Sequence, residues 1–448
     1  MIKYFDSSYV GTVDMENCGY LGTPINERTY TNDQLAGALY KAEEYAKTMD
    51  RNGYDTFWMA EHHFQPEGTE CIPNLLMMAM HLAGITKNIR IGCGFNVVPM
   101  WHPLRLAEDY ATAEILTRGR TVFGVARGYH TREVETFGAP LTDQAANREM
   151  FEEGTDLVFK AFNEAKFSHK GKYYTCPPEV PYRGYTLKEL TLVPRPLKLP
   201  VECWQPIQGG TERAFDFMAK HGICGVIGGG SAEGGVVQRH VDGFMAAYKR
   251  RGIDLIPGER MSIGYQFHIA SSKEQAMKEA AIYYEENMKM FGELRLSRAI
   301  TEEQIAAMRN PALVPKTKLP RIEDAVKAGG FLAGTADEII EQLKATEKAL
   351  PGLERLMLTA TRYAAVHRSR AARALRQGSH ARLQERKGGS RGRVSAEPAA
   401  TTAVNTKIRA LAFEPAPLLR RAQTSKTDGQ EGPNDPATNA LLHRYGQC

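Results

Sequence analysis

Long apolar runs are missing from this 448-residue chain. No stretch of about 18 consecutive apolar residues occurs, so the sequence predicts no membrane span. Its first residues, Met1–Asp6, lack the long apolar core of a secretory signal. The seven cysteines include no Cys-x-x-Cys pair, and their odd number argues against a zinc ribbon or a disulfide framework. These absences predict a protein of the reducing cytoplasm.

The sequence also has little that indicates a nicotinamide site or a nucleic-acid partner. No Gly-x-Gly-x-x-Gly follows a predicted strand, so no Rossmann site for a nicotinamide is expected. The net charge of +5 comes from residues 361–448, which hold 16 Lys and Arg against 6 Asp and Glu. Residues 1–360 therefore carry 41 basic and 46 acidic side chains. A mildly acidic body argues against a nucleic-acid surface.

One stretch, Gly53–Phe64, organises our interpretation of the chain. Tyr54–Ala60 is apolar on both faces, which is typical of a strand in a parallel sheet covered on both sides. Glu61, His62 and His63 follow where this strand ends. Chemistry in parallel α/β folds gathers at the carboxyl ends of strands, although histidines there also serve as plain polar caps.

Strand and helix patterns alternate along residues 1–360 and predict an α/β fold, a (β/α)8 TIM barrel with insertions. The expected insertions are Phe167–Leu199 and Glu293–Gly330. The expected strands are Ile2–Phe5, Tyr54–Ala60, Ile89–Val98, Thr121–Val125, Pro200–Gln205, Gly222–Ile227, Met261–Ala270 and Leu353–Thr359. The expected helices include one that begins at Thr31-Asn32-Asp33 and runs to about Arg51, one from Pro73, Pro103 to about Leu116, about Gln144 to Asn163, one ending at His221, Ala232–Arg251, Lys273–Phe291 and Ala336–Ala349.

Residues 361–448 form a second region, a basic tail rich in Arg, Ala, Ser and Pro. This composition predicts a largely disordered segment. It is also what a shifted reading frame gives in a GC-rich gene, and we state that as a hypothesis. A native ending would instead supply an amphipathic eighth helix.

Four motifs in this order resemble those of the bacterial luciferase-like flavin-dependent monooxygenases, and the resemblance covers residues 1–359. No single motif is decisive, but their order is. They are Asp55-Thr56-Phe57-Trp58-Met59-Ala60-Glu61-His62-His63-Phe64, Pro99-Met100-Trp101-His102-Pro103-Leu104-Arg105-Leu106-Ala107-Glu108-Asp109, Gly119-Arg120 leading to Phe123-Gly124-Val125-Ala126-Arg127-Gly128, and Gln208-Gly209-Gly210-Thr211.

The resemblance implies a two-component monooxygenase. Reduced FMN, supplied by a separate flavin reductase, would react with dioxygen to give a C4a-peroxide that oxygenates a small organic substrate. His62 matches the family's catalytic histidine, while His63 is expected to be structural. Arg127 matches the arginine that holds phosphate and flavin. The resemblance also implies a homodimer paired through the helices after the second and third strands.

Further binding residues are expected around these. Gly209, Gly210 and Thr211 open a helix, and its N–H groups suit the FMN phosphate. Family members often have a cis peptide within the stretch that reads Gly94-Phe95-Asn96 here, where Gly94 would allow that geometry, and Asn96 is expected to reach the flavin ring. We expect a substrate pocket formed by Trp101, His102 and Tyr129, with His130 beside them; Trp101 is equally compatible with the core. Ala126 stands where luciferase subunits carry a reactive cysteine, so no thiol chemistry is expected.

Three alternatives remain open from the sequence. The same fold serves deazaflavin-dependent hydride transfer, and Glu61-His62-His63 does not exclude it. A non-catalytic flavin-binding barrel is another alternative. A metal-dependent barrel hydrolase would use His62, His63, His102 and His130, but no His-x-His ends the first strand, so no metal ligands are predicted.

Overall fold

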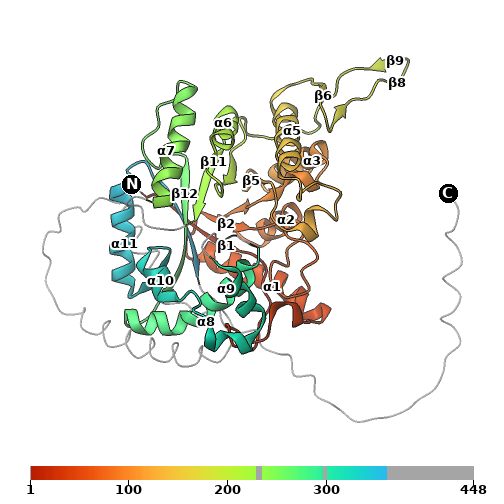
Figure 1. The fold of residues 1–448 in the computed structure, drawn as a ribbon. Coiled ribbons are helices and arrows are strands. Elements are labelled where there is room, and N and C mark those ends of the chain that lie inside the picture. Colours follow the sequence, from red (N-terminus) through yellow and green to blue (C-terminus); the bar gives the residue numbers. More distant parts are fainter. Residues whose placement is uncertain (1, 229–234, 295, 297–299, 361–448) are drawn as a thin grey trace, which may run out of the picture. The chain divides into compact units, whose positions relative to one another are not determined.

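The computed structural model describes residues 2–228, 235–294, 296 and 300–360 of the chain. Within them, parallel strands pair in the order β1-β2-β3-β5-β10-β11-β12-β14, and β14 pairs with β1, which closes an eight-strand barrel. The predicted (β/α)8 fold is thereby confirmed (Figure 1). The barrel strands are β1 Tyr4–Tyr9, β2 Thr56–Met59, β3 Arg90–Cys93, β5 Thr121–Ala126, β10 Cys203–Pro206, β11 Cys224–Gly228, β12 Met261–Ile269 and β14 Arg355–Ala360.

Amphipathic helices connect these strands, and local sequence signals set their ends. The first helix starts where the Thr31 side chain accepts the backbone N–H of Gln34 in a capping box, and it packs Ala38, Ala42 and Ala46 inward. The connecting helices are α1 Asn32–Arg51, α2 Leu75–Ile85, α3 Pro103–Leu116, α5 Gln144–Asn163, α6 Glu212–His221, α7 Gly235–Arg250, α8 Lys273–Gly292 and α11 Ala336–Ala349. Their bounds match the predicted ones within a few residues.

The first strand is longer than predicted. It continues through Asp6 to Tyr9, because polar side chains in it are paired inside the barrel. Asp6 is fully buried and accepts hydrogen bonds from Arg355 Nη1 (2.6 Å) and from Trp58 Nε1 (2.8 Å). A buried carboxylate in a strand requires such partners, and these are distant in sequence.

The third predicted strand, Ile89–Val98, is interrupted. The peptide bond between Gly94 and Phe95 is cis, as the family resemblance implies, and the short strand β4 (Asn96–Val97) and η2 (Val98–Met100) follow it. A further strand, β13 (Phe331–Gly334), was not predicted. It pairs with the last residues of β12 beside the barrel.

Both predicted insertions are present. The first holds two hairpins, β6 (His169–Lys170) with β7 (Thr175–Cys176) and β8 (Val180–Tyr182) with β9 (Tyr185–Leu187). The second holds α9 (Glu302–Arg309), η3 (Pro311–Lys316) and α10 (Ile322–Lys327). The described helices include none long and apolar enough to cross a membrane. The predicted disorder and the shifted reading frame of residues 361–448 lie outside the described residues.

Candidate active site

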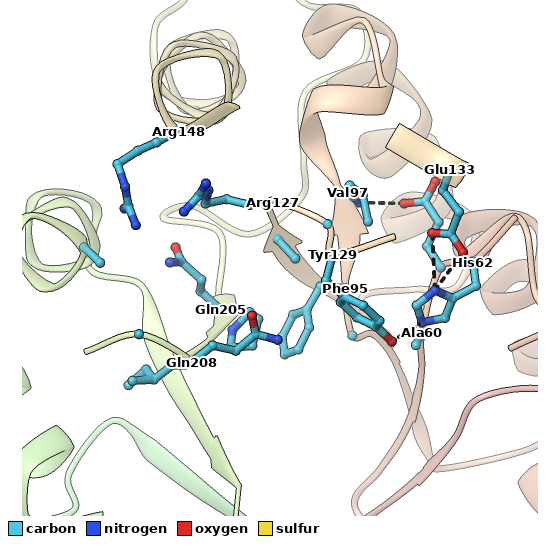
Figure 2. Close-up of a pocket in the computed structure, with 18 of the residues that line it drawn as sticks. Ala60, His62, Phe95, Val97, Arg127, Tyr129, Glu133, Arg148, Gln205 and Gln208 are labelled. Carbon is cyan, nitrogen blue, oxygen red and sulfur yellow. Dashed lines mark hydrogen bonds and ion pairs between the residues drawn. The ribbon is translucent and has the colours of Figure 1, made fainter. Parts of the chain in front are cut away.

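A cavity of about 430 Å³ opens at the carboxyl ends of the barrel strands. Residues after β2, β5 and β10 form most of its wall, so three strand ends converge on one space, as is usual for (β/α)8 barrels. Figure 2 shows Arg127 and Arg148 at one end, His62 with Glu133 at the other, and Phe95 and Tyr129 between them in this view. The two ends differ in charge.

The cationic end is built from β5 and α5. Arg127 follows β5 and is held in place by Asn147, whose Oδ1 accepts from Arg127 Nε at 2.8 Å. Arg148 lies beside it on α5, and its nearest carboxylate among the described residues is Glu152, at 3.8 Å. Burial and the nearby charge of Arg148 lower the pKa of Arg127 to about 10. Two like charges kept this close favour an anionic ligand.

The start of α6 lines the same end. Thr211 is the N-cap and accepts from Ala214 N. Gly210 has a φ of +58°, a backbone conformation that favours glycine. A Cβ at this position would also lie 2.7 Å from a ring carbon of His240, so both the backbone conformation and the available space favour glycine here. Gly209, Gly210 and Thr211 all line the cavity, and Arg213 of α6 shares the Glu152 carboxylate with Arg148, so the start of α6 lies on the Arg148 side. The phosphate role of this turn stays a prediction.

Gln205, the third residue of β10, was missed by sequence reasoning. It lines the cavity and is only 8% exposed, and its side-chain Oε1 has no hydrogen-bond partner among the described residues. A buried amide oxygen without a partner is costly, so a ligand donor in the cavity would satisfy it. The available signal was its position at the end of a predicted strand, shortly before the Gly-Gly-Thr motif.

His62 forms the other end. Its Nδ1 lies 3.2 Å from Glu133 Oε1, and its Nε2 lies 3.2 Å from Glu70 Oε1 and 3.1 Å from the Tyr129 hydroxyl. Burial lowers the pKa of His62, but the hydrogen bond to Glu133 and the charges of Glu70 and Glu133 outweigh it, and the pKa is raised. The imidazole therefore holds a proton more firmly than a free one.

Glu133 and Glu70 were not predicted as site residues. Glu133 lies on the single turn α4 (Thr131–Val134) and also accepts Gln65 Nε2 at 2.7 Å; Glu70 lies in the loop after β2 and contacts His130 Nε2 at 2.9 Å. The interactions with the histidines hold the pKa of both carboxyls below their usual range, although burial opposes this. Neither glutamate belongs to a periodic pattern that could have marked it.

The remaining predicted site residues do not line the cavity. Asn96 is fully buried, and its Nδ2 donates to Gly124 O at 2.9 Å. Trp101 Nε1 donates to Glu61 Oε1 at 2.8 Å, and the His102 ring contacts Tyr174. Of the four residues predicted for the substrate pocket, the structure brings only Tyr129 to the cavity wall; Trp101, His102 and His130 do not line it.

His63 also lies outside the lining, with its Nε2 3.2 Å from Glu61 Oε1. This agrees with the structural role expected for it. Glu61 accepts the backbone N–H of Val97 as well, at 2.6 Å, and so joins the ends of β2 and β4. The second histidine of the motif thus supports the scaffold behind the cavity.

Fold and cavity together define the class, a (β/α)8-barrel protein with a ligand cavity that is cationic at one end and rich in His and Glu at the other. Residues 23–351 match the family model of luciferase-like monooxygenases, and the chain belongs to this family. The resemblance inferred from the four motifs is confirmed.

Among relatives, the chain is 25% identical over 337 residues to the oxygenase component of a flavin-dependent trigonelline monooxygenase from Acinetobacter baylyi, covering 72% of this chain and 84% of that protein. In matches to other curated relatives, the chain spans only 34% to 40% of their length.

Two solved structures share the fold. The oxygenating constituent of 3,6-diketocamphane monooxygenase from Pseudomonas putida, in complex with FMN, has a TM-score of 0.59 at 18% identity over 81% of this chain and 92% of that one. An F420-dependent secondary alcohol dehydrogenase has a TM-score of 0.53 at 14% identity over 81% of this chain and 94% of that one. At these identities the likeness shows the fold alone.

Proposed function

We propose that this chain is the oxygenase of a two-component system, which uses reduced FMN from a separate reductase and dioxygen to oxygenate a small organic molecule. The observation that carries the proposal is the cavity itself, with Arg127 and Arg148 at one end and His62 at the other. We further propose a cytoplasmic homodimer, as the family resemblance implies.

The cavity residues fit FMN. Arg127, Arg148 and the N–H groups of Gly209–Thr211 would hold the phosphate, for which a cationic helix start is suited. The unpartnered Gln205 Oε1 would accept a hydrogen bond from the bound molecule. A volume of about 430 Å³ is within the range of small-molecule cavities.

Reduced FMN, when bound, supplies the electrons that activate dioxygen. The protein's part is to orient the flavin, exclude water and manage a proton. His62 would carry that proton at Nε2, with Glu133 fixing the ring through Nδ1. The Tyr129 hydroxyl lies 3.1 Å from the same Nε2, and Tyr129 lines the cavity. It would connect His62 to a bound molecule by hydrogen bonds.

Photoreduced FMN mixed anaerobically with the protein, and then with oxygen in a stopped-flow cell, tests the proposal. We expect oxidised FMN to return more slowly than from free reduced FMN, with delayed release of hydrogen peroxide. The variant H62N should keep FMN affinity but lose the delay, while H63N, a change outside the cavity lining, should keep both.

Unchanged reoxidation of FMN would contradict the proposal. If reduced deazaflavin binds under the same conditions and FMN does not, hydride transfer becomes the function. If neither cofactor binds, the cavity serves another ligand.

A further inference from the structure

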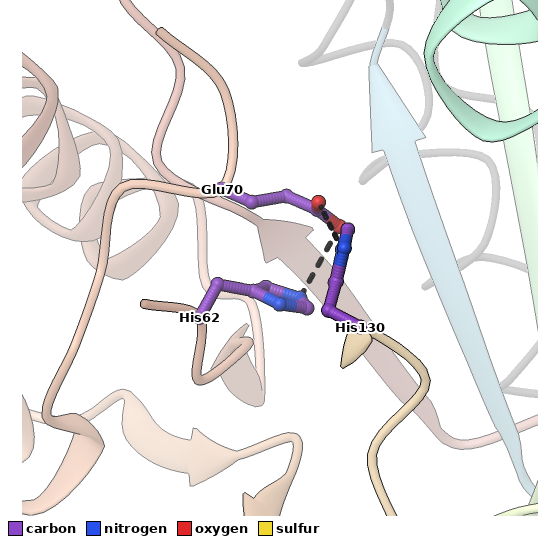
Figure 3. Close-up of side chains that lie close together, drawn as sticks. All are labelled: His62, Glu70 and His130. Atoms are coloured by element: carbon purple, nitrogen blue, oxygen red, sulfur yellow. Dashed lines mark hydrogen bonds and ion pairs between the residues drawn. The ribbon is translucent and has the colours of Figure 1, made fainter. Parts of the chain in front are cut away.

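The side chains of His62, Glu70 and His130 form a cluster at the His62 end of the cavity, and the proposed flavin chemistry does not require this cluster. One ligand atom from each of His62, Glu70 and His130 can be chosen so that all lie within 4.8 Å of one another (Figure 3). They come from the end of β2, from the β2–α2 loop and from the residue before α4. All three are buried, at 5%, 2% and 8% exposure.

We propose that these three residues form a binding site for a divalent transition-metal ion, for which Zn²⁺ is the natural probe. Two imidazoles and one carboxylate are a donor set that zinc and iron(II) sites use. In a tetrahedral site with bonds of about 2.0–2.1 Å, ligand atoms lie about 3.3 Å apart. His62 Nε2 lies 3.2 Å from Glu70 Oε1 and His130 Nε2 lies 2.9 Å from Glu70 Oε2, so each imidazole is near that spacing from one of the two oxygens of the carboxylate.

A second observation points the same way. A metal-binding histidine almost always uses its other ring nitrogen to donate to a carboxylate or carbonyl, which fixes the ring. His62 does this, since its Nδ1 faces Glu133 Oε1 at 3.2 Å, and Glu133 is held in turn by Gln65 Nε2 at 2.7 Å. The outer support of a metal ligand is thus in place, and it presents Nε2 to Glu70.

Charge and access are also suitable. With neutral imidazoles, one divalent cation balances the carboxylates of Glu70 and Glu133, which are both buried. His62 and Glu70 line the cavity, so a position on the ion would face it for a water or a ligand oxygen. The Tyr129 hydroxyl, hydrogen-bonded to Glu70, is the neighbouring protein oxygen.

The ion and a proton on His62 Nε2 compete for one lone pair. Metal-loaded protein would therefore lack the proton carrier of the proposed monooxygenase reaction. The inference does not rest on that reaction, because metal binding is measured without flavin, and failure of one leaves the other standing.

Titration calorimetry with ZnCl₂ on chelator-treated, flavin-free protein tests the site. We expect one ion per chain, and binding at least about tenfold weaker in E70Q and in H130Q. E133Q, which removes the outer support, should weaken binding by about 10- to 100-fold. H81Q is the matched control, because His81 pairs with Glu43 on the surface of α2 (2.9 Å) and should bind as wild type does.

Each variant's thermal midpoint and FMN affinity are measured in parallel. His130 does not line the cavity, so H130Q should keep FMN affinity if it is folded. Absence of zinc binding by wild type would overturn the proposal. Equal affinity of wild type, E70Q and H130Q would overturn it as well, since the ion would then bind elsewhere.

Discussion

Replacing Arg148 by glutamine should separate phosphate binding from ring binding in the cavity. Arg148 lines the cationic end, and its nearest described carboxylate, Glu152, is 3.8 Å away and is shared with Arg213 at 2.6 Å. At 3.8 Å the contact is too long for a hydrogen bond, so most of the donor capacity of Arg148 remains available for a ligand. The change R148Q removes its charge and keeps much of its length.

The magnitude follows from the kind of bond lost. A hydrogen bond to a charged group contributes about 1.5–3 kcal/mol, which corresponds to an increase of about 10- to 150-fold in the Kd for FMN. Riboflavin has no phosphate, so its Kd should stay near that of wild type. The flavin-free protein should become more stable, because burial and the charge of Arg148 together depress the pKa of Arg127 to about 10, and R148Q removes the second cause.

Flavin fluorescence titrations with FMN and riboflavin, together with thermal unfolding of the flavin-free protein, measure these effects. The control is R105Q, because Arg105 lies on the exposed face of α3 with Glu108 and Asp109 as partners at 3.3 Å. Equal losses for FMN and riboflavin would refute the assignment of the phosphate end. A lower thermal midpoint for R148Q would refute the electrostatic part.

Other changes test the scaffold. In G124A the new Cβ would lie 2.1 Å from a backbone carbonyl oxygen of β3, so urea unfolding should show a loss of about 1–3 kcal/mol or more, whereas G84A, with nothing within 4 Å, should gain about 0.5–1 kcal/mol. Burial opposes ionisation of Asp50, but three backbone N–H donors before β3 hold its pKa below the usual value. Its stabilisation is present above the unfolded pKa and is lost as the pH falls through the folded one. D50N should therefore have a lower free energy of unfolding than wild type at neutral pH. This difference in free energy should shrink as the pH falls below about 4. W101F should lose about 1–3 kcal/mol from the broken bond to Glu61 and leave FMN affinity unchanged; weaker FMN binding would restore Trp101 to the pocket.

Most of the barrel could be predicted because its signals are local. Strand β2 is buried on both faces and its last three residues belong to the apolar run of residues 57–60, and α1 starts at a threonine cap. The continuation of β1 through Asp6 could not be predicted this way, because the partner of the Asp6 carboxylate, Arg355, is 349 residues away. Strand β13 is only four residues long, too short for periodicity to distinguish from a loop.

The site divides in the same way. His62 and Arg127 stand in motifs at strand ends and could be found from the sequence. The carboxylate partners of His62 could not, because Glu133 is 71 residues away, Glu70 stands in a loop without periodicity, and both pairings depend on how the loops fold over the barrel. Asn96 stands in the predicted strand, but its Nδ2 donates to Gly124 O and the residue does not line the cavity, a contact that the sequence pattern does not mark.

The charges at the two ends of the cavity bear on how the proposed flavin must lie. With its phosphate at Arg127 and Arg148, the molecule places an anion beside two cations. Turned end for end, it would bring the phosphate to Glu70 and Glu133, both buried carboxylates whose pKa values lie below their usual range. Like charges brought together at a buried site cost several kcal/mol, so the reversed orientation would be rare at equilibrium. Tight contacts with the flavin ring are therefore not needed to orient the molecule. The opposite charges at the two ends of the cavity would already favour one direction.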